Sequence, residues 1–300
     1  MVYIILFTTR SNLRRQFSTS QFKISIVPIK LLAMKVFSAS LTYTLGKSLY
    51  VPLTSRSNSY TLPQTRGPNF LLPSSVVSSL LLLRKIESDP TSDQNGNDFD
   101  ESEIRKKEKC VMPLSLSQMV PGCPFLNDEL LHPSADLLLN EIRENLNLGD
   151  TKSVVFAGEG EPTLRLETLK LLCQKINSEY GNDNINMRIV TNGLVLSHME
   201  DRKSVLSNLK QNGVDELSVA LMTSCNKQYD DLIKPTSNEL NDEGLSNSHA
   251  KLCQMIQDAI EVGLTIECTG VDRDFVDKGL AEDLADKLGA SSFRWRPYFP

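Results

Sequence analysis

The chain has 300 residues, with 32 Lys and Arg against 37 Asp and Glu, and this length allows one or two domains of ordinary size. Its charge is unevenly divided, since residues 1–86 contain 11 basic and no acidic residues, whereas residues 87–300 carry a net charge of −16. An acidic region of this kind argues against a nucleic-acid groove, which needs clustered Lys and Arg. Six Cys are too few for a disulfide scaffold and indicate an intracellular protein, and no apolar run is long enough for a membrane span.

The first third of the chain has the composition of a targeting segment. Residues 1–86 are basic, rich in Ser and free of acidic residues, which is typical of a transit peptide for a plastid or mitochondrion. The alternative is a spurious or disordered N-terminus. Residues 87–109 form a charged linker, because they hold too few apolar side chains to offset the entropy of ordering. We therefore expect residues 1–108 to lack a packed core and order to begin between residues 110 and 135.

From about residue 130, strand and helix patterns alternate. Short apolar segments predict strands at 153–157, 187–190, 216–221, 264–268 and 293–296. Apolar stripes at helical spacing lie between them, and Thr163 is expected to cap one of these helices. This alternation indicates βαβ units and a parallel sheet within residues 110–300. The units are too few for a complete eight-unit barrel, which leaves an open doubly wound sheet or a partial barrel.

Polar residues stand at the ends of the expected strands, where α/β proteins bind their ligands. The first strand is followed by Gly158-Glu159-Gly160-Glu161-Pro162, a turn that is too acidic to hold a pyrophosphate. The second is followed by Thr191-Asn192-Gly193, and the later strands carry Ser218, Glu267 and Arg294. Each residue alone is typical of a turn, a cap or a solvated position. Together, and in this order, these residues indicate a functional site more specifically than any one of them does alone.

These segments resemble the radical S-adenosylmethionine (radical SAM) superfamily. Gly160-Glu161-Pro162 looks like the end of that family's Gly-Gly-Glu-Pro motif, with Glu159 where the first Gly usually stands. The whole series is most similar to the small radical SAM proteins associated with TatD-type deoxyribonucleases, over about residues 130–300. The resemblance implies an α/β fold, a six-unit βα partial barrel of the TIM type, whose first strand is missing or altered in this chain.

The resemblance also implies a set of residues that contact S-adenosylmethionine. These are Gly158, Glu159, Gly160, Glu161, Pro162, Thr191, Asn192, Ser218, Glu267 and Arg294. In the family, the Gly-Glu-Pro turn holds the methionyl amino group. A [4Fe–4S] cluster passes an electron to S-adenosylmethionine, and the resulting 5′-deoxyadenosyl radical takes hydrogen from a substrate, here of unknown identity. A reductant protein such as a flavodoxin or ferredoxin is the implied partner.

The cysteines depart from the family pattern. The cluster requires a Cys-x₃-Cys-x₂-Cys loop after the first strand, because thiolates are the soft anionic ligands that iron needs, and this sequence has no such loop. Only Cys110 and Cys123 precede the Gly-Glu-Pro turn, and they are weak candidates for metal ligands. Cys173 and Cys253 fall on apolar helix faces and are expected in the core. Cys268 ends an expected strand and could reach the ligand-binding rim.

Three hypotheses follow. The favoured one is a radical SAM enzyme whose gene model lost an exon with the first strand and the cluster loop. The second is a degenerate barrel that binds S-adenosylmethionine without radical chemistry, and the third is a protein-interaction module. We expect Gly158, Glu161, Thr191, Asn192, Ser218, Glu267 and Arg294 to converge at one end of the sheet. We also expect that the 300 residues as written do not cleave S-adenosylmethionine reductively.

Overall fold

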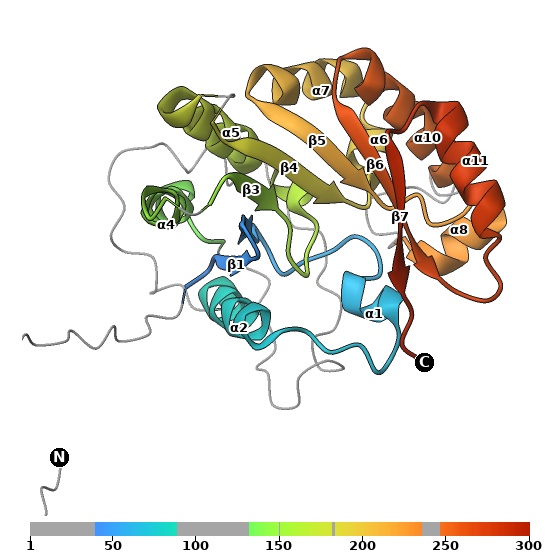
Figure 1. Ribbon diagram of the computed structural model, residues 1–300, viewed down its shortest axis with the longest axis horizontal. Coiled ribbons are helices and arrows are strands. Elements are labelled where there is room, and N and C mark those ends of the chain that lie inside the picture. Colours follow the sequence, from blue (N-terminus) through green and yellow to red (C-terminus); the bar gives the residue numbers. More distant parts are fainter. Residues whose placement is uncertain (1–39, 89–131, 150, 182–183, 236–246) are drawn as a thin grey trace, which may run out of the picture. The chain divides into compact units, whose positions relative to one another are not determined.

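The computed structural model describes residues 40–88, 132–149, 151–181, 184–235 and 247–300. Within this part of the chain, seven strands form one sheet in chain order. They are β1 (Tyr43–Leu45), β2 (Ser48–Val51), β3 (Ser153–Phe156), β4 (Asn186–Thr191), β5 (Val214–Val219), β6 (Thr265–Asp272) and β7 (Ser292–Pro297). β1 pairs antiparallel with β2, whereas β2 to β7 are all parallel. The sheet curls into a half-barrel (Figure 1), so the expected α/β partial barrel with six parallel strands is confirmed.

Helices surround this sheet on two sides. They are α1 (Leu62–Arg66), α2 (Ser74–Ser88), α4 (Ala135–Asn147), α5 (Leu166–Tyr180), α6 (Leu194–His198), α7 (Arg202–Gln211), α8 (Asn226–Ile233), α10 (Ser248–Glu261) and α11 (Lys278–Leu288), with a 3₁₀ turn η2 (Pro162–Arg165). In Figure 1, α5, α7, α10 and α11 lie along the outer side of the sheet, and α1 and α2 lie on the other side. None of the helices in the described residues is both long and apolar enough to cross a membrane.

Side chains alternate along the strands between an apolar outer face and a polar inner face. The outer positions belong to the main core, as shown by Leu49, Phe156 and Ile189, which are fully buried. The positions between them carry polar groups such as Arg188 and Ser218. Because successive strand residues point to opposite faces, the outer face packs on helices, and the inner face is left to line a cavity.

The first strand of the barrel comes from the N-terminal third of the chain. Leu49 of β2 pairs with Val154 of β3, and Val51 pairs with Phe156. Leu49 and Val51 are fully buried in the main core, together with Leu83 of α2. The expectation that residues 1–108 lack a packed core is therefore wrong for residues 40–88, and the first strand is present rather than missing. Residues 1–39 and 89–131, with the expected targeting segment and most of the linker, lie outside the described residues.

The five strands expected from the sequence correspond to β3 to β7. β6 extends beyond its expected range of 264–268, since it continues to Asp272. Thr163 does not cap a helix with its side chain. Instead, its backbone N–H is bound by the side chain of Glu161, which begins the 3₁₀ turn η2 ahead of α5.

Candidate functional site

A cavity of about 400 Å³ lies at the carboxyl ends of the parallel strands. Each strand from β2 to β7, or the segment that follows it, contributes to its wall, in the form of Ser57, Gly158, Thr191, Ala220, Thr269 and Arg294. Tyr43, Tyr50, Phe70, Leu72, Val76 and Leu80 supply an apolar wall. Because one cavity collects residues from all the strand ends, it is the candidate ligand site of this fold.

The segment after β2 crosses the cavity region and reaches the opposite edge of the sheet. The Phe299 N–H, just past β7, donates to the Arg66 carbonyl over 2.8 Å. The Arg273 guanidinium donates to the Thr65 carbonyl over 2.8 Å. α1 is thereby tied to the end of β7, which holds the segment in place along the cavity.

The turn after β3 packs directly against the loop after β2, which comprises residues 52–61 between β2 and α1. The Glu161 N–H donates to the Arg56 carbonyl over 2.7 Å. A Cβ at Gly160 would lie 2.3 Å from the Thr54 carbonyl oxygen and 2.4 Å from that of Arg56. Only glycine fits there, because these obstacles are backbone atoms that cannot move aside cheaply. The glycine of the Gly-Glu-Pro turn thus serves a contact between two loops.

Glu161 is buried, and its carboxylate is occupied by the chain's own donors. Oε1 accepts hydrogen bonds from the Thr163 N–H (3.1 Å), the Thr163 hydroxyl (2.5 Å) and the Thr191 hydroxyl (2.7 Å). Oε2 accepts one from the Asn192 N–H at 2.8 Å. Burial raises the pKa of Glu161, and these hydrogen bonds oppose the rise. The carboxylate therefore fixes the ends of β3 and β4 relative to each other.

Glu159, which stands where the family has glycine, forms a buried ion pair with Arg84 of α2. Burial raises the pKa of Glu159, and the Arg84 guanidinium opposes that rise. Although Glu159 borders the cavity, its charge is balanced by α2. Pro162 is buried at the start of η2 and is not among the residues that line the cavity.

Asn192 connects the end of β4 to the loop after β2. Its Nδ2 donates to Asn58 Oδ1 over 2.7 Å and to Ser59 Oγ over 2.8 Å. Its Oδ1 accepts from the Leu194 N–H at the start of α6. Three hydrogen bonds leave this amide with one preferred orientation, so it holds the loop over the strand end.

The remaining expected residues form a chain of contacts on the inner face of the sheet. Ser218 of β5 donates to Glu267 of β6 over 2.8 Å, and Arg294 of β7 pairs with the same carboxylate at 2.6 Å. Arg294 lines the cavity, as do Gly158, Glu161, Thr191 and Asn192. Five of the seven residues expected to converge therefore line one cavity, whereas Ser218 and Glu267 are not among its lining residues, and the convergence of all seven stays a prediction. Their direct contact with a ligand stays a prediction.

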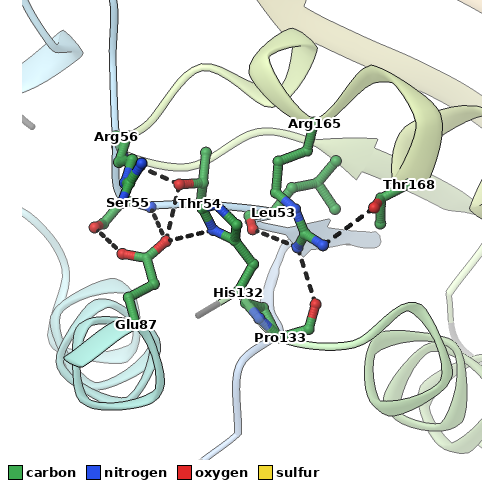
Figure 2. Close-up of polar contacts among 9 residues, drawn as sticks. All are labelled: Leu53, Thr54, Ser55, Arg56, Glu87, His132, Pro133, Arg165 and Thr168. Carbon is green, nitrogen blue, oxygen red and sulfur yellow. Dashed lines mark hydrogen bonds and ion pairs between the residues drawn. The ribbon is translucent and has the colours of Figure 1, made fainter. Parts of the chain in front are cut away.

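A second network, made of polar contacts with Glu87 and Arg165, also holds the loop after β2 (Figure 2). Glu87 of α2 is fully buried and accepts hydrogen bonds from the Thr54 hydroxyl (2.8 Å), the Ser55 N–H (3.0 Å) and the Ser55 hydroxyl. His132 Nδ1 lies 3.4 Å from Glu87 Oε1. Burial would raise the pKa of Glu87, but the contacts with His132 and Ser55 outweigh it and lower that pKa. Burial lowers the pKa of His132, although Glu87 opposes the shift.

Arg165 fastens the start of the same loop to the helices around it (Figure 2). Its guanidinium donates to the Leu53 carbonyl (3.0 Å), the Pro133 carbonyl (2.9 Å) and the Thr168 hydroxyl (3.1 Å). Arg165 is buried and follows directly on the Gly-Glu-Pro turn in η2. The two loops that meet at the cavity therefore share one set of polar supports.

The resemblance implies an iron–sulfur cluster at the loop after the first barrel strand, which in this chain is the loop after β2. The residues of this loop and of α1 after it do not fit such a cluster. Ser57, Thr61 and Gln64 stand at the Cys-x₃-Cys-x₂-Cys spacing, but hydroxyl and amide groups are not soft anionic ligands. Two of them already serve the loop itself, since Ser57 Oγ accepts from the Ser59 N–H and Gln64 Oε1 accepts from the Thr61 N–H. No group of three His, Cys, Asp or Glu side chains that could hold a metal ion occurs in the described residues.

The cysteines with a described environment lie away from the cavity wall. Cys173 is fully buried in the core, and Cys253 is partly buried and packs against that core, both as expected. Cys268 also belongs to the core and lies within β6, so the expectation that it could reach the rim is wrong. Burial raises the pKa of its thiol to about 12. Cys110 and Cys123 lie outside the described residues.

Comparison with known proteins identifies distant structural neighbours. No family model and no curated protein matches the chain. Streptococcus suis SuiB bound to S-adenosylmethionine is 18% identical, with a TM-score of 0.42, and the match covers 59% of this chain and 36% of SuiB. The radical S-adenosylmethionine methyltransferase TsrM from Kitasatospora setae is 10% identical, with a TM-score of 0.40 and coverage of 57% and 31%. The chain spans about a third of the length of these proteins. Likeness at this level assigns neither a family nor an activity to this chain.

Proposed function

We propose that this chain is a degenerate barrel of the radical SAM type that binds S-adenosylmethionine and does not cleave it reductively. The sequence resemblance supplies the ligand class. Seven of the ten residues that the resemblance implies line one cavity, which supports a binding role. The missing cluster ligands support the absence of the radical step.

The observation that carries this proposal is the loop after β2. The favoured hypothesis explained the missing cysteines by a lost exon that encoded both the first strand and its loop. β2 supplies that strand, and the loop after it packs on Gly160 and is bonded to Asn192. A complete, hydrogen-bonded loop without cysteine, at the position of the cluster loop, favours the degenerate barrel over a defective gene model.

Two further expectations stay predictions. Membership of the TatD-associated subgroup rests on the sequence resemblance alone. A reductant partner such as a flavodoxin or ferredoxin is required only by a chain that carries a cluster. Formation of 5′-deoxyadenosine would indicate radical chemistry and is therefore measured in addition to binding.

The test measures binding and cleavage separately on the full chain. Equilibrium dialysis with radiolabelled S-adenosylmethionine should give one site per chain. Asn192→Ala should weaken this binding about tenfold, because it removes hydrogen bonds that hold the loop over the cavity. Asn184→Ala, at an exposed asparagine that bonds only to the Tyr180 carbonyl through its side chain, is the matched control. It should bind like the unaltered chain.

The cleavage assay uses anaerobically reconstituted protein with a strong reductant and chromatographic detection of 5′-deoxyadenosine. We expect no product above the level of a Cys110→Ala, Cys123→Ala double variant. Product above that level would show that these two cysteines support a cluster, and would overturn the proposed loss of activity. Failure to bind S-adenosylmethionine at all would overturn the ligand assignment.

A further inference from the structure

The cavity wall contains four arginines, and three of them have partners. Arg188 lies 3.6 Å from Glu216, and Arg294 lies 2.6 Å from Glu267. Arg66 donates to the Pro297 carbonyl and lies 4.2 Å from the centre of the Phe70 ring. The side chain of Arg296 lines the same cavity and has neither a hydrogen bond nor an ion pair with any described residue. Arg296 is therefore the one arginine of this wall whose guanidinium has no hydrogen bond, ion pair or ring contact with a described residue.

Arg296 is partly buried, and its surroundings disfavour its charge. Burial, followed by the nearby charges of Arg294 and Arg66, lowers the pKa of Arg296 to about 10, although the Glu267 carboxylate opposes the shift. Tyr50 also lies close enough to influence it. The guanidinium stays charged at neutral pH, and an anion beside it would relieve both the desolvation and the repulsion.

An apolar surface shares the cavity with this guanidinium. Tyr43 and Tyr50 stack with ring centres 5.3 Å apart. Val76 and Leu80 of α2 are buried in one cluster with Tyr43, and Tyr50 packs against that cluster. Both tyrosines and both aliphatic residues line the cavity. This surface is formed by residues 40–80, whereas the residues that the resemblance assigns to S-adenosylmethionine in this cavity belong to the Gly158–Glu161 turn, the end of β4 and Arg294 of β7.

We propose that Arg296 anchors the carboxylate of a second ligand, an organic acid with an aromatic or aliphatic body that lies on the surface formed by Tyr43, Tyr50, Val76 and Leu80. The proposal deepens the proposed function by naming the class of molecule that shares the cavity with S-adenosylmethionine. A planar guanidinium matches a carboxylate through two parallel hydrogen bonds.

The experiment titrates the full chain calorimetrically with 4-phenylbutyrate, and then with its neutral amide, 4-phenylbutyramide. We expect one site for the acid and binding of the amide that is roughly tenfold to hundredfold weaker, since the amide loses a charge-assisted pair. Arg296→Gln should reduce the affinity for the acid to that for the amide. Arg296→Lys should retain part of it. Arg143→Gln, at an exposed pair with Glu179, removes one charge outside the cavity and should bind the acid like the unaltered chain.

The comparison of acid with amide needs no variant, so it tests the role of the carboxylate even if Arg296→Gln fails to fold. Equal binding of acid and amide, or unchanged binding by a folded Arg296→Gln variant, would overturn the proposal. So would strict competition between the acid and S-adenosylmethionine, because Arg296 would then serve the carboxylate of the methionyl group. If S-adenosylmethionine does not bind but the acid binds through Arg296, the proposed function fails and this inference stands.

Discussion

At the scale of single residues, the two glutamates of the turn after β3 have structural partners. Glu161 receives four hydrogen bonds from the ends of η2 and β4, and Glu159 pairs with Arg84. A buried carboxylate without donors is costly, so donors within the chain satisfy it first. The sequence pattern identifies the turn correctly. It does not show whether the carboxylates face a ligand or the protein.

Replacement of Glu161 by glutamine should destabilise the fold. An amide keeps one acceptor oxygen but turns an NH₂ group toward protein donors, which leaves buried groups unsatisfied at a cost of about 1–3 kcal/mol. Urea denaturation measures the change in the free energy of unfolding. Glu179→Gln, at an exposed pair with Arg143, should cost less than about 1 kcal/mol. Equal stability of the two variants would contradict the structural role of Glu161.

The pair of Glu87 and His132 should make the fold less stable in acid. The folded pKa of His132 lies below its unfolded value of about 6.5, so its contribution is complete above that pH and falls as the pH drops below it. The folded pKa of Glu87 is also lowered, and its contribution is lost as the pH falls through that folded pKa. The free energy of unfolding should therefore decline from pH 7 toward pH 4.

The measurement is a series of urea denaturation curves across this range. His132→Gln removes the imidazole titration and should flatten the part of the profile between pH 7 and pH 5. An unchanged slope in that variant would assign the acid sensitivity to other groups.

At the scale of elements, the loop after β2 and α2 act as one unit. α2 supplies Glu87, which holds residues 54 and 55, and Arg84, which balances Glu159. The loop is therefore ordered by polar side chains of the chain itself. In a barrel with a bound cluster, metal ligation would contribute to that order.

Substitution of Ser57, Thr61 and Gln64 together by cysteine should restore a metal site in this loop. The three positions have the Cys-x₃-Cys-x₂-Cys spacing and lie after the first strand of the barrel. After anaerobic reconstitution we expect about four irons per chain, as a [4Fe–4S] cluster requires, with visible absorbance that the unaltered chain lacks. Ser57→Cys alone is the control. If the triple variant bound no more iron than Ser57→Cys, the loop after β2 would not be equivalent to the cluster loop of radical SAM proteins.

At the scale of the whole molecule, residues 40–88 and the strands from β3 onward share one core. Leu49, Val51 and Leu53 are buried in the same cluster as the outer residues of β3 and β4. Hydrogen bonds from α1 to the end of β7 then join the two edges of the sheet. The N-terminal third thus supplies two strands, β1 and β2, and part of the cavity wall.

Deletion of residues 1–88 should abolish cooperative folding of the remainder. It removes β2 and α2, exposes the edge of β3 and opens the core beside Val154 and Phe156. Thermal unfolding followed by near-ultraviolet circular dichroism measures the loss of fixed packing. A cooperative transition in the truncated chain, at the temperature seen for the full chain, would show that the N-terminal third is dispensable.

The sequence by itself determined the alternation of β3 to β7 with their helices, because each of these elements carries its own apolar periodicity. It also determined which polar residues end the strands, and that a cysteine loop for a cluster is absent. Local patterns were sufficient for these features because parallel strands place their carboxyl ends at one edge of the sheet.

The tertiary structure alone decided which segment pairs with β3. β2 has only four residues, Ser48–Val51, in a Ser-rich and acid-free context, and its partner lies about a hundred residues further along the chain. β3 is equally short but lies within the alternation of strands and helices, whereas β2 lies in a segment whose composition indicates a targeting peptide. The register of β2 is set by contacts across the sheet. The same long-range packing decided that Glu161 and Glu159 are bound by the protein and that Arg296 is left facing the cavity.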